Sequence, residues 1–216
     1  RKPSIYAKVG IDKNLSDDLR VRLTGSVYTT KSSVSNTLFG GDRTGSNYQY
    51  VMENTAATLT ANAFSGRFNP GFRDNVTTFM VNPFVKFKGL EFFGTWEKAS
   101  GNTAVENGEL QYSDGTRPTI NALDDREATQ TEFDLVYRFG KHENFYIGGK
   151  YNKVDATIAL GQSTAATDIQ QGTRTDVGIE RTSFAAGWFI TRNVLFKAEY
   201  VTQNYDGYPT EHILSD

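Results

Sequence analysis

Residues 75 to 101 alternate apolar and polar side chains along two arms. Only Lys88 and Gly89 separate the arms, the length of a tight hairpin turn in which Gly89 supplies a positive φ. A period of two predicts strands, and arms of about ten residues match the roughly 9–11 residues with which a tilted strand crosses a bilayer. The stretch therefore predicts a membrane-spanning β-hairpin. Its apolar side consists of Phe79, Val81, Pro83, Val85, Phe87, Leu90, Phe92, Gly94 and Trp96.

The same two-arm pattern occurs three more times. One copy precedes the hairpin, and its second arm places Arg20 and Arg22 opposite an apolar side, which no soluble core accepts unless the charges are paired. The sequence thus predicts eight antiparallel strands in four hairpins. The arms of the three further copies are residues 4–12 and 19–28, 129–139 and 145–154, and 174–191 and 194–203.

The connections differ in length according to their position. Within hairpins they are short, whereas polar stretches at about 31–74, 102–127 and 155–173 separate the hairpins. Strict alternation of short and long connections places all the short turns at one end, as in outer-membrane barrels with short periplasmic turns and long external loops. The predicted fold is all-β, an antiparallel up-and-down transmembrane β-barrel with about eight strands in this chain. Residues 1–216 are expected to form one barrel domain or a segment of a larger barrel.

Composition agrees with this prediction and excludes several classes of function. Hydrophobic residues are 38% and aromatic residues 13% of the 216, which suits a barrel in which alternate residues face an apolar medium. The net charge of −2 provides no basic surface for nucleic acid. The absence of cysteine excludes disulfides and cysteine-based zinc or redox chemistry. The longest apolar run, residues 184–190, is far below the roughly 20 residues of a spanning helix, and residues 1–10 lack the apolar core of a signal peptide.

The strand segments FMVNPFVKF, FDLVYRF, FYIGGKY and VLFKAEY, with the stretches SGRFNPGFRD and NPFVKFKGLEFFGTWEKASG, resemble outer-membrane β-barrel proteins of the porin type. The resemblance covers nearly the whole chain as a pattern and includes no catalytic signature. It implies the outer membrane of a Gram-negative bacterium, contact with outer-membrane lipid, and transport of small hydrophilic solutes by passive diffusion without a cofactor. Porins usually end in a strand with a C-terminal aromatic residue, whereas this chain ends in HILSD. Either the eight strands belong to a larger barrel, or the eighth strand closes the barrel and the tail is additional.

If the apolar sides meet lipid, the opposite sides line the lumen with nearly balanced charge. In a closed eight-stranded barrel the interior is just wide enough for side chains, so these charges would pair with one another. In a wider barrel they would line water and set a weak selectivity. The predicted lumen-lining residues are the basic Lys8, Arg20, Arg22, Lys86, Arg138, Lys150, Arg181 and Lys197, and the acidic Asp12, Glu91, Glu97, Glu132, Asp134 and Glu199.

Two further sets of residues have more than one interpretation. In porins a long loop often folds inward, so Arg43, Arg67 and Arg73 are candidate constriction charges; alternatively, the segment 31–74 is a solvated external loop whose arginines pair with nearby acids. Aromatic residues near strand ends suit girdles at the membrane interface, where amphipathic rings lie at headgroup depth, or else ordinary core packing in a soluble β-protein. These aromatic residues are Phe87, Trp96, Tyr137, Phe139, Tyr151, Trp188 and Tyr200.

Catalytic and metal-binding patterns are weak. Only two histidines are present, His142 and His212, and nothing marks a Ser-His-Asp geometry. The acidic run 124–127 lacks the spacing of a calcium loop and is typical of a solvated surface. We therefore expect no enzyme, no cofactor and no metal. Three functions are compatible with the pattern: a porin-like diffusion channel, a barrel without a channel that serves as an anchor or presents its loops to partners, and a soluble lipocalin-like barrel that binds a ligand.

Overall fold

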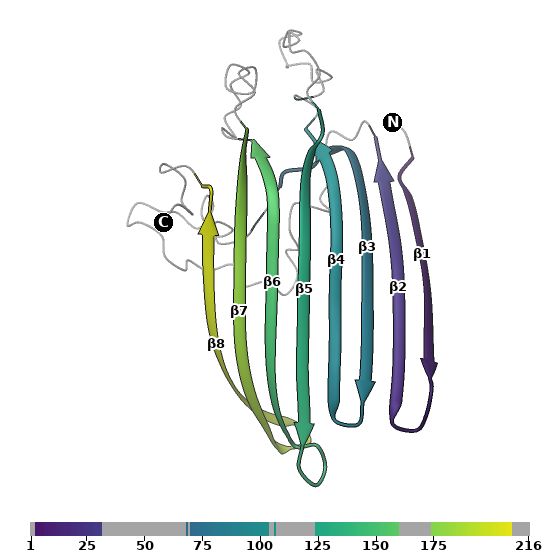
Figure 1. The fold of residues 1–216 in the computed structure, drawn as a ribbon, viewed down its shortest axis with the longest axis vertical. Helices are drawn as coiled ribbons and strands as arrows, with labels where there is room; N and C mark the ends of the chain where they lie inside the picture. Colours follow the sequence, from purple (N-terminus) through teal and green to yellow (C-terminus); the bar gives the residue numbers. More distant parts are fainter. Residues whose placement is uncertain are drawn as a thin grey trace.

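The computed structural model describes residues 3–31, 68, 70–103, 106, 124–159 and 174–208. The described residues form one antiparallel sheet of eight strands without a helix, and neighbours in the sheet are neighbours in the sequence (Figure 1). The predicted all-β, up-and-down arrangement of eight strands is confirmed. The strands are β1 (Ile5–Asn14), β2 (Leu19–Thr30), β3 (Asp74–Phe87), β4 (Leu90–Asn102), β5 (Arg126–Phe139), β6 (Phe145–Ala159), β7 (Arg174–Thr191) and β8 (Val194–Asp206).

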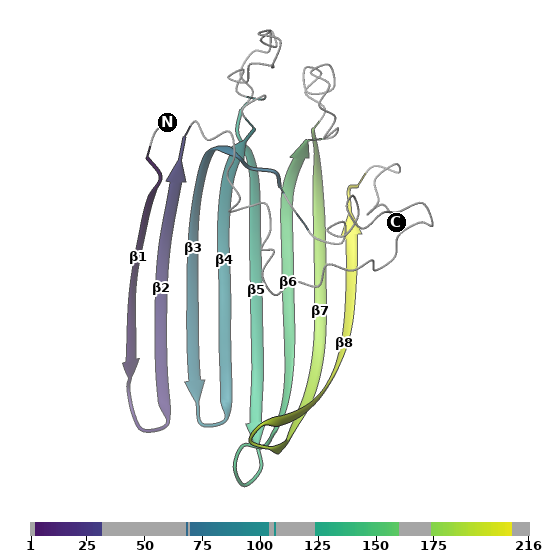
Figure 2. The ribbon, with the colours of Figure 1, turned by 180° about the vertical axis from the view of Figure 1, so that it is seen from behind.

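The sheet is open. Within the described residues β1 pairs only with β2, and β8 pairs only with β7. Figures 1 and 2 show a curved sheet with these two strands at opposite edges. A curved sheet of strands that alternate in direction is compatible with a barrel. In the part of the chain that the structure describes, no helix has the length and apolarity needed to span a membrane.

All four short turns lie at one end of the sheet, the lower end in Figure 1, as the sequence predicts. In the turn between β3 and β4, however, the prediction that Gly89 supplies the positive φ is wrong. Lys88 has the positive φ, 52°, and it is the only residue of this two-residue turn with one. Gly89 is instead required for space, because a Cβ there would lie 2.2 Å from the backbone oxygen of Arg138 on β5. The Gly89 carbonyl also accepts a hydrogen bond of 2.8 Å from the Arg138 N–H, which ties the turn to the neighbouring strand.

At the opposite end the strands reach further than the pattern predicts. β4 continues to Asn102, β5 begins at Arg126 and β6 continues to Ala159, so each occupies part of an expected loop. The added residues, 102, 126–128 and 155–159, are Ala, Thr, Asn, one Ile and three charged residues, and they do not continue the apolar alternation along the sequence. The extensions on β5 and β6 pair with neighbouring strands, for example Ala128 with Ala99 and with Ala156. We call this end of the sheet the loop end and the other the turn end.

The strand register keeps the two sides of every hairpin separate across the whole sheet. Apolar residues pair with apolar or small residues, as Val85 does with Phe92 and Leu135 with Gly149. Pro83, which cannot donate a ladder hydrogen bond, falls in a gap of the pairing between β3 and β4. Opposite it Gly94 provides room, because a Cβ there would lie 3.0 Å from the proline ring. We name the two sides the apolar face and the polar face.

The most buried part of the structure lies on the polar face at the loop end. Ala99, Ala128, Ala156 and Val177 are paired in one row across β4, β5, β6 and β7. Their small side chains leave space above the sheet, and the fully buried ring of Phe72 packs against them. Burying a phenylalanine side chain contributes roughly 1.5–3 kcal/mol, so this row holds the chain before β3 against the polar face.

Candidate functional site

The polar face brings together every residue predicted to line the lumen. The pairs Asp12 with Arg22, Lys86 with Glu91, and Asp134 with Lys150 lie opposite one another in register. The remaining predicted residues lie on the same face as these pairs, because they are separated from them by an even number of positions along a strand or are joined to that face by the register of the neighbouring strand. All fourteen therefore lie on one face, namely Lys8, Asp12, Arg20, Arg22, Lys86, Glu91, Glu97, Glu132, Asp134, Arg138, Lys150, Arg181, Lys197 and Glu199.

On β3, β5 and β7 the apolar face is more exposed than the polar face. Along β5, Phe133, Leu135, Tyr137 and Phe139 are exposed, with Leu135 at 50%. The residues between them on the polar face are half-buried, and the Glu132 side chain is only 15% exposed. β3 and β7 show the same alternation. Soluble proteins seldom expose an apolar patch of this extent while they shield charged side chains.

The shielded charges of β3 to β6 form two ion-pair clusters. In the first, Glu91 accepts a hydrogen bond of 3.0 Å from the Lys86 Nζ, and the Arg138 Nε lies 3.6 Å from the same Glu91 oxygen. In the second, Lys150 binds Glu132 and also lies 3.6 Å from Asp134. The Asn152 amide donates a 2.8 Å hydrogen bond to Glu132. The first cluster has two cations and one carboxylate, and the second has one cation and two carboxylates, so their charges balance only when the two clusters are taken together.

The arginines of β2 form a more basic region near the sheet edge. Arg20 makes a bidentate pair with Asp12, with distances of 2.9 and 2.6 Å. The Arg22 guanidinium lies 5.0 Å from the centre of the Phe84 ring, a cation–π contact. Lys8, Arg22 and Arg181 make no ion pair with a described residue. At the other edge Lys197 pairs with Glu199 at 2.8 Å.

The predicted girdle residues all lie on the apolar face and form two groups. Near the turn end Tyr137, Phe139, Phe145 and Trp188 stack in a row, with successive ring centres 5.7–5.9 Å apart. Phe87 also belongs to this group, and the Lys88 ammonium lies 5.5 Å from its ring centre. The second group lies further from the turns: Trp96 is opposite Thr131 near the loop end, Tyr151 is opposite Phe133, and Tyr200 is in the row of Leu135 near the middle of the apolar face.

Beyond the second aromatic group, the same side of the sheet becomes charged. Lys98 pairs with Glu127 at 2.9 Å, and Lys153 pairs with Asp155 at 3.0 Å. Glu180 on β7 lies opposite Lys153 in register. The apolar face is therefore a band of limited height between the turns and a charged margin. On the central strands it covers about seven to nine residues, which is roughly 24–31 Å along an extended strand.

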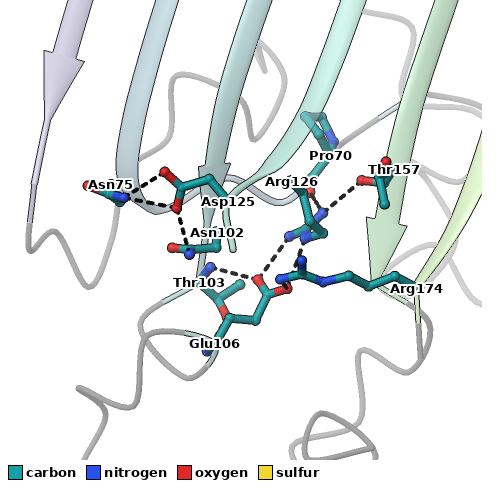
Figure 3. Close-up of polar contacts among 9 residues, drawn as sticks. All are labelled: Pro70, Asn75, Asn102, Thr103, Glu106, Asp125, Arg126, Thr157 and Arg174. Carbon is teal, nitrogen blue, oxygen red and sulfur yellow. Dashed lines mark hydrogen bonds and ion pairs between the residues drawn. The ribbon is translucent and has the colours of Figure 1, made fainter. Parts of the chain in front are cut away.

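A buried polar cluster pins two loop segments to the polar face at the loop end (Figure 3). Arg126 donates to Glu106 through Nε at 2.9 Å and Nη2 at 3.1 Å, and both side chains are only 2% exposed. The Arg126 Nη1 also donates to the Pro70 carbonyl at 2.6 Å, and the guanidinium lies 5.3 Å from the Phe72 ring centre. Arg174 from β7 donates to Glu106 at 3.1 Å. We call Arg126, Glu106, Arg174, Pro70 and Phe72 the loop-end cluster.

The surroundings of Glu106 favour its charged form. Burial raises the pKa of the carboxyl, but the hydrogen bonds and positive charge of Arg126, with smaller contributions from the Thr103 N–H and from Arg174, outweigh burial. The pKa of Glu106 is therefore lowered from its ordinary value of 4.5. Glu106 is a carboxylate at neutral pH, and its charge holds Arg126 and Arg174 together.

The acidic run 124–127 has structural contacts. Asp125 accepts from the Asn75 amide at 2.9 and 2.7 Å and from the Asn102 amide at 2.8 Å. These bonds fix Asn75, which has a φ of 53°, at the start of β3. No group of three or more potential metal ligands occurs among the described residues.

The predicted constriction arginines lie mostly outside the described residues. Arg43 and Arg67 belong to undescribed parts of the chain, and Arg73 is exposed, with its backbone N–H donating to the Asn102 carbonyl at 3.0 Å. Sequence reasoning missed Arg126, Glu106 and Arg174, because it assigned the first two to a polar loop and gave the third no role. The alternation of Arg126, Ala128, Gln130 and Glu132 extends the pattern of β5 and was the one available signal.

Comparison with known proteins adds no assignment: no family model, curated protein or solved structure matches the chain.

Proposed function

We propose that this protein is an outer-membrane β-barrel channel through which small hydrophilic solutes diffuse passively. The observation that carries the proposal is the reversed exposure of the two faces, with large apolar side chains exposed and charged side chains shielded. In a bilayer the exposed apolar face would contact lipid, and because its side chains are apolar, their removal from water would not be costly.

The shape of the apolar face supports the same proposal. Transmembrane barrels have an outward apolar band about 25 Å tall with aromatic girdles at both margins. The apolar face here has a row of stacked aromatic rings at its turn end and Trp96 towards its loop end, where Lys98, Lys153 and Glu180 form the charged margin. Tyrosine and tryptophan suit such margins because one end of each ring system is apolar and the other forms hydrogen bonds.

The polar face supplies what passive diffusion requires. Its ion-paired side chains would line water without binding a solute tightly, and a solute would move down its own gradient. Because basic and acidic residues are close to balance, the charges would give weak selectivity. The Lys86, Glu91 and Arg138 cluster is the place where this selectivity is easiest to alter, since one carboxylate serves two cations.

Permeability of reconstituted vesicles tests the proposal. We expect vesicles that contain the folded protein to admit small neutral sugars and to exclude large ones, whereas vesicles without protein admit neither. In planar bilayers, Glu91→Gln should shift the reversal potential of the current towards that of an anion-selective channel, because Lys86 and Arg138 lose their counter-charge. Glu127→Gln is the matched control, because Glu127 lies on the opposite side of the sheet and should leave the reversal potential unchanged. Folded protein without permeability would contradict the channel.

A barrel without a channel is the second candidate, and the ion-pair clusters of β3 to β6 favour it, because paired side chains fill space. Such a barrel would insert into vesicles and migrate differently on gels before and after heating, yet it would conduct no ions in planar bilayers. A soluble lipocalin-like barrel requires apolar residues inside, opposite to the exposure on β5. Stable protein without detergent, and no heat-dependent gel shift, would support that third function.

A further inference from the structure

The two edges of the sheet lack partners among the described residues. β1 spans 10 residues and β8 spans 13, and neither contains a proline. Proline is one device by which soluble proteins protect a sheet edge from pairing. In a bilayer each unpaired backbone N–H or C=O costs several kcal/mol, so spanning strands must be paired on both sides. Both edges are therefore suited to bind another strand.

Part of the space over the polar face at the loop end is filled by the chain itself. Main chain, and not only side chains, lies over this face at the loop end. A Cβ on Gly101 would lie 3.1 Å from Phe72, and the Pro70 carbonyl accepts from Arg126. Glu106 adds a second segment above β5 and β7. An eight-stranded barrel has an interior just wide enough for side chains. If the polar face lines the lumen, the chain at Pro70 and Phe72, together with Glu106, needs a wider barrel than eight strands form.

We propose that a second copy of this chain completes the barrel, with β8 of each copy paired to β1 of the other. This proposal rests on the proposed function, because only a membrane-spanning sheet must close. β1 and β8 run in opposite directions, so a twofold axis along the barrel makes both new pairings antiparallel and equivalent. The result has sixteen strands, eight from each copy. Barrels of roughly 16–18 strands leave an aqueous channel, with room for the segments on the polar face.

The outward residues of the two edges match in character. β1 presents Val9 and Ile11 on the apolar face, and β8 presents Phe196 and Tyr200. Pairing β8 with β1 of another copy would continue the apolar band without a break. It would also bring Lys8 and Asp12 beside the strand that carries Lys197 and Glu199 on the polar face.

Disulfide formation between single-cysteine variants tests the second copy, because the natural chain has no cysteine. Opposite residues of antiparallel strands have Cα atoms about 4.5–5.5 Å apart, within the range that a disulfide spans. Val9→Cys is mixed during refolding in lipid vesicles with Phe196→Cys, Ala198→Cys or Tyr200→Cys in turn, so that different registers are sampled. We expect a disulfide-linked species of twice the 24.0 kDa chain mass in at least one mixture. Each variant alone should give none.

Two controls make the outcomes decisive. A chain with both Ala186→Cys and Ala198→Cys, which are paired on β7 and β8, should form an internal disulfide and show that oxidation is efficient. A chain with both Val9→Cys and Ala198→Cys should form no internal link. An internal link there, or no link in any mixture, would overturn the second copy.

Vesicle insertion and sugar permeability are measured on the same samples. Protein that inserts and conducts but forms no link between chains overturns the second copy and leaves the channel intact. Protein that never inserts overturns both proposals.

Discussion

Arg126 is the residue on which most of the loop end depends. Its guanidinium contacts Glu106, the Pro70 and Thr157 carbonyls and the Phe72 ring, so one side chain joins four parts of the chain. The pair with Glu106 is fully buried, and the value of such a pair lies mainly in the cost of breaking it.

Arg126→Ala should therefore destabilise the protein strongly. Removing one partner of a buried ion pair costs about 3–5 kcal/mol, because the other charge stays buried without compensation. Urea unfolding in lipid vesicles measures the change. Arg192→Ala, in the exposed turn between β7 and β8, is the control and should change the free energy of unfolding by less than about 0.5 kcal/mol. An equally small effect of Arg126→Ala would contradict the role of the cluster.

The lowered pKa of Glu106 predicts a pH dependence with a definite sign. A carboxyl whose pKa is lower in the folded state contributes stability above its unfolded pKa, near 4.5, and loses that contribution as pH falls through the folded pKa. The difference in the free energy of unfolding between the natural protein and Glu106→Gln should be constant at neutral pH and should shrink below pH 4.5. Urea unfolding at several pH values measures both proteins. A difference that grows as pH falls would contradict the assignment.

At the scale of the strand, contact between the apolar face and lipid can be tested by placing a charged residue at two positions, one in the middle of the apolar band and one at its margin. Leu135 lies in the middle of the apolar band on β5, whereas Thr131 lies on the same face beside Lys153 at its charged margin. Arginine on a lipid-facing strand costs roughly 2–4 kcal/mol at mid-depth and about 0–1 kcal/mol near the interface.

Leu135→Arg should therefore destabilise the inserted protein by about 2–4 kcal/mol, and Thr131→Arg by less than about 1 kcal/mol. Urea unfolding in vesicles gives both values. Since Leu135 is 50% exposed, a soluble protein would tolerate arginine there, and equal small effects at both positions would count against lipid contact.

The strands and their faces could be predicted from the sequence because each depends only on local alternation. The alternation on β5 identifies both a strand and its two sides, with Phe133, Leu135 and Tyr137 on one side and Glu132, Asp134 and Arg138 on the other. The strand extensions could not be located, because alanine at positions such as Ala128 and Ala156 is neither clearly apolar nor charged.

The loop-end cluster was not predictable for a different reason. Arg174 and Glu106 are 68 residues apart in the sequence, and they meet only because four hairpins pair in one register. The role of Gly89 could not be predicted for the same reason, because the residue that leaves no space for a side chain there is Arg138 on the next hairpin. Contacts between hairpins leave no periodic signal in one sequence.

At the scale of the whole molecule, the sheet has a polar face that holds charge and chain segments, an apolar face of limited height, and two edges without described partners. Each property has a simple explanation if lipid lies on one side and water on the other. The edge pairing proposed above then decides the width of the lumen, and the ion-pair clusters decide its selectivity.

The most direct test of this account is a cysteine scan of residues 130 to 139 on β5. Each single variant carries an environment-sensitive fluorophore in vesicles and is quenched in turn by a lipid-attached quencher and by aqueous iodide. We predict a period of two, with lipid quenching at Phe133, Leu135 and Tyr137 and iodide quenching at Glu132, Asp134 and Arg138. Uniform quenching along the strand, or the opposite phase, would contradict the assignment of the apolar face to lipid.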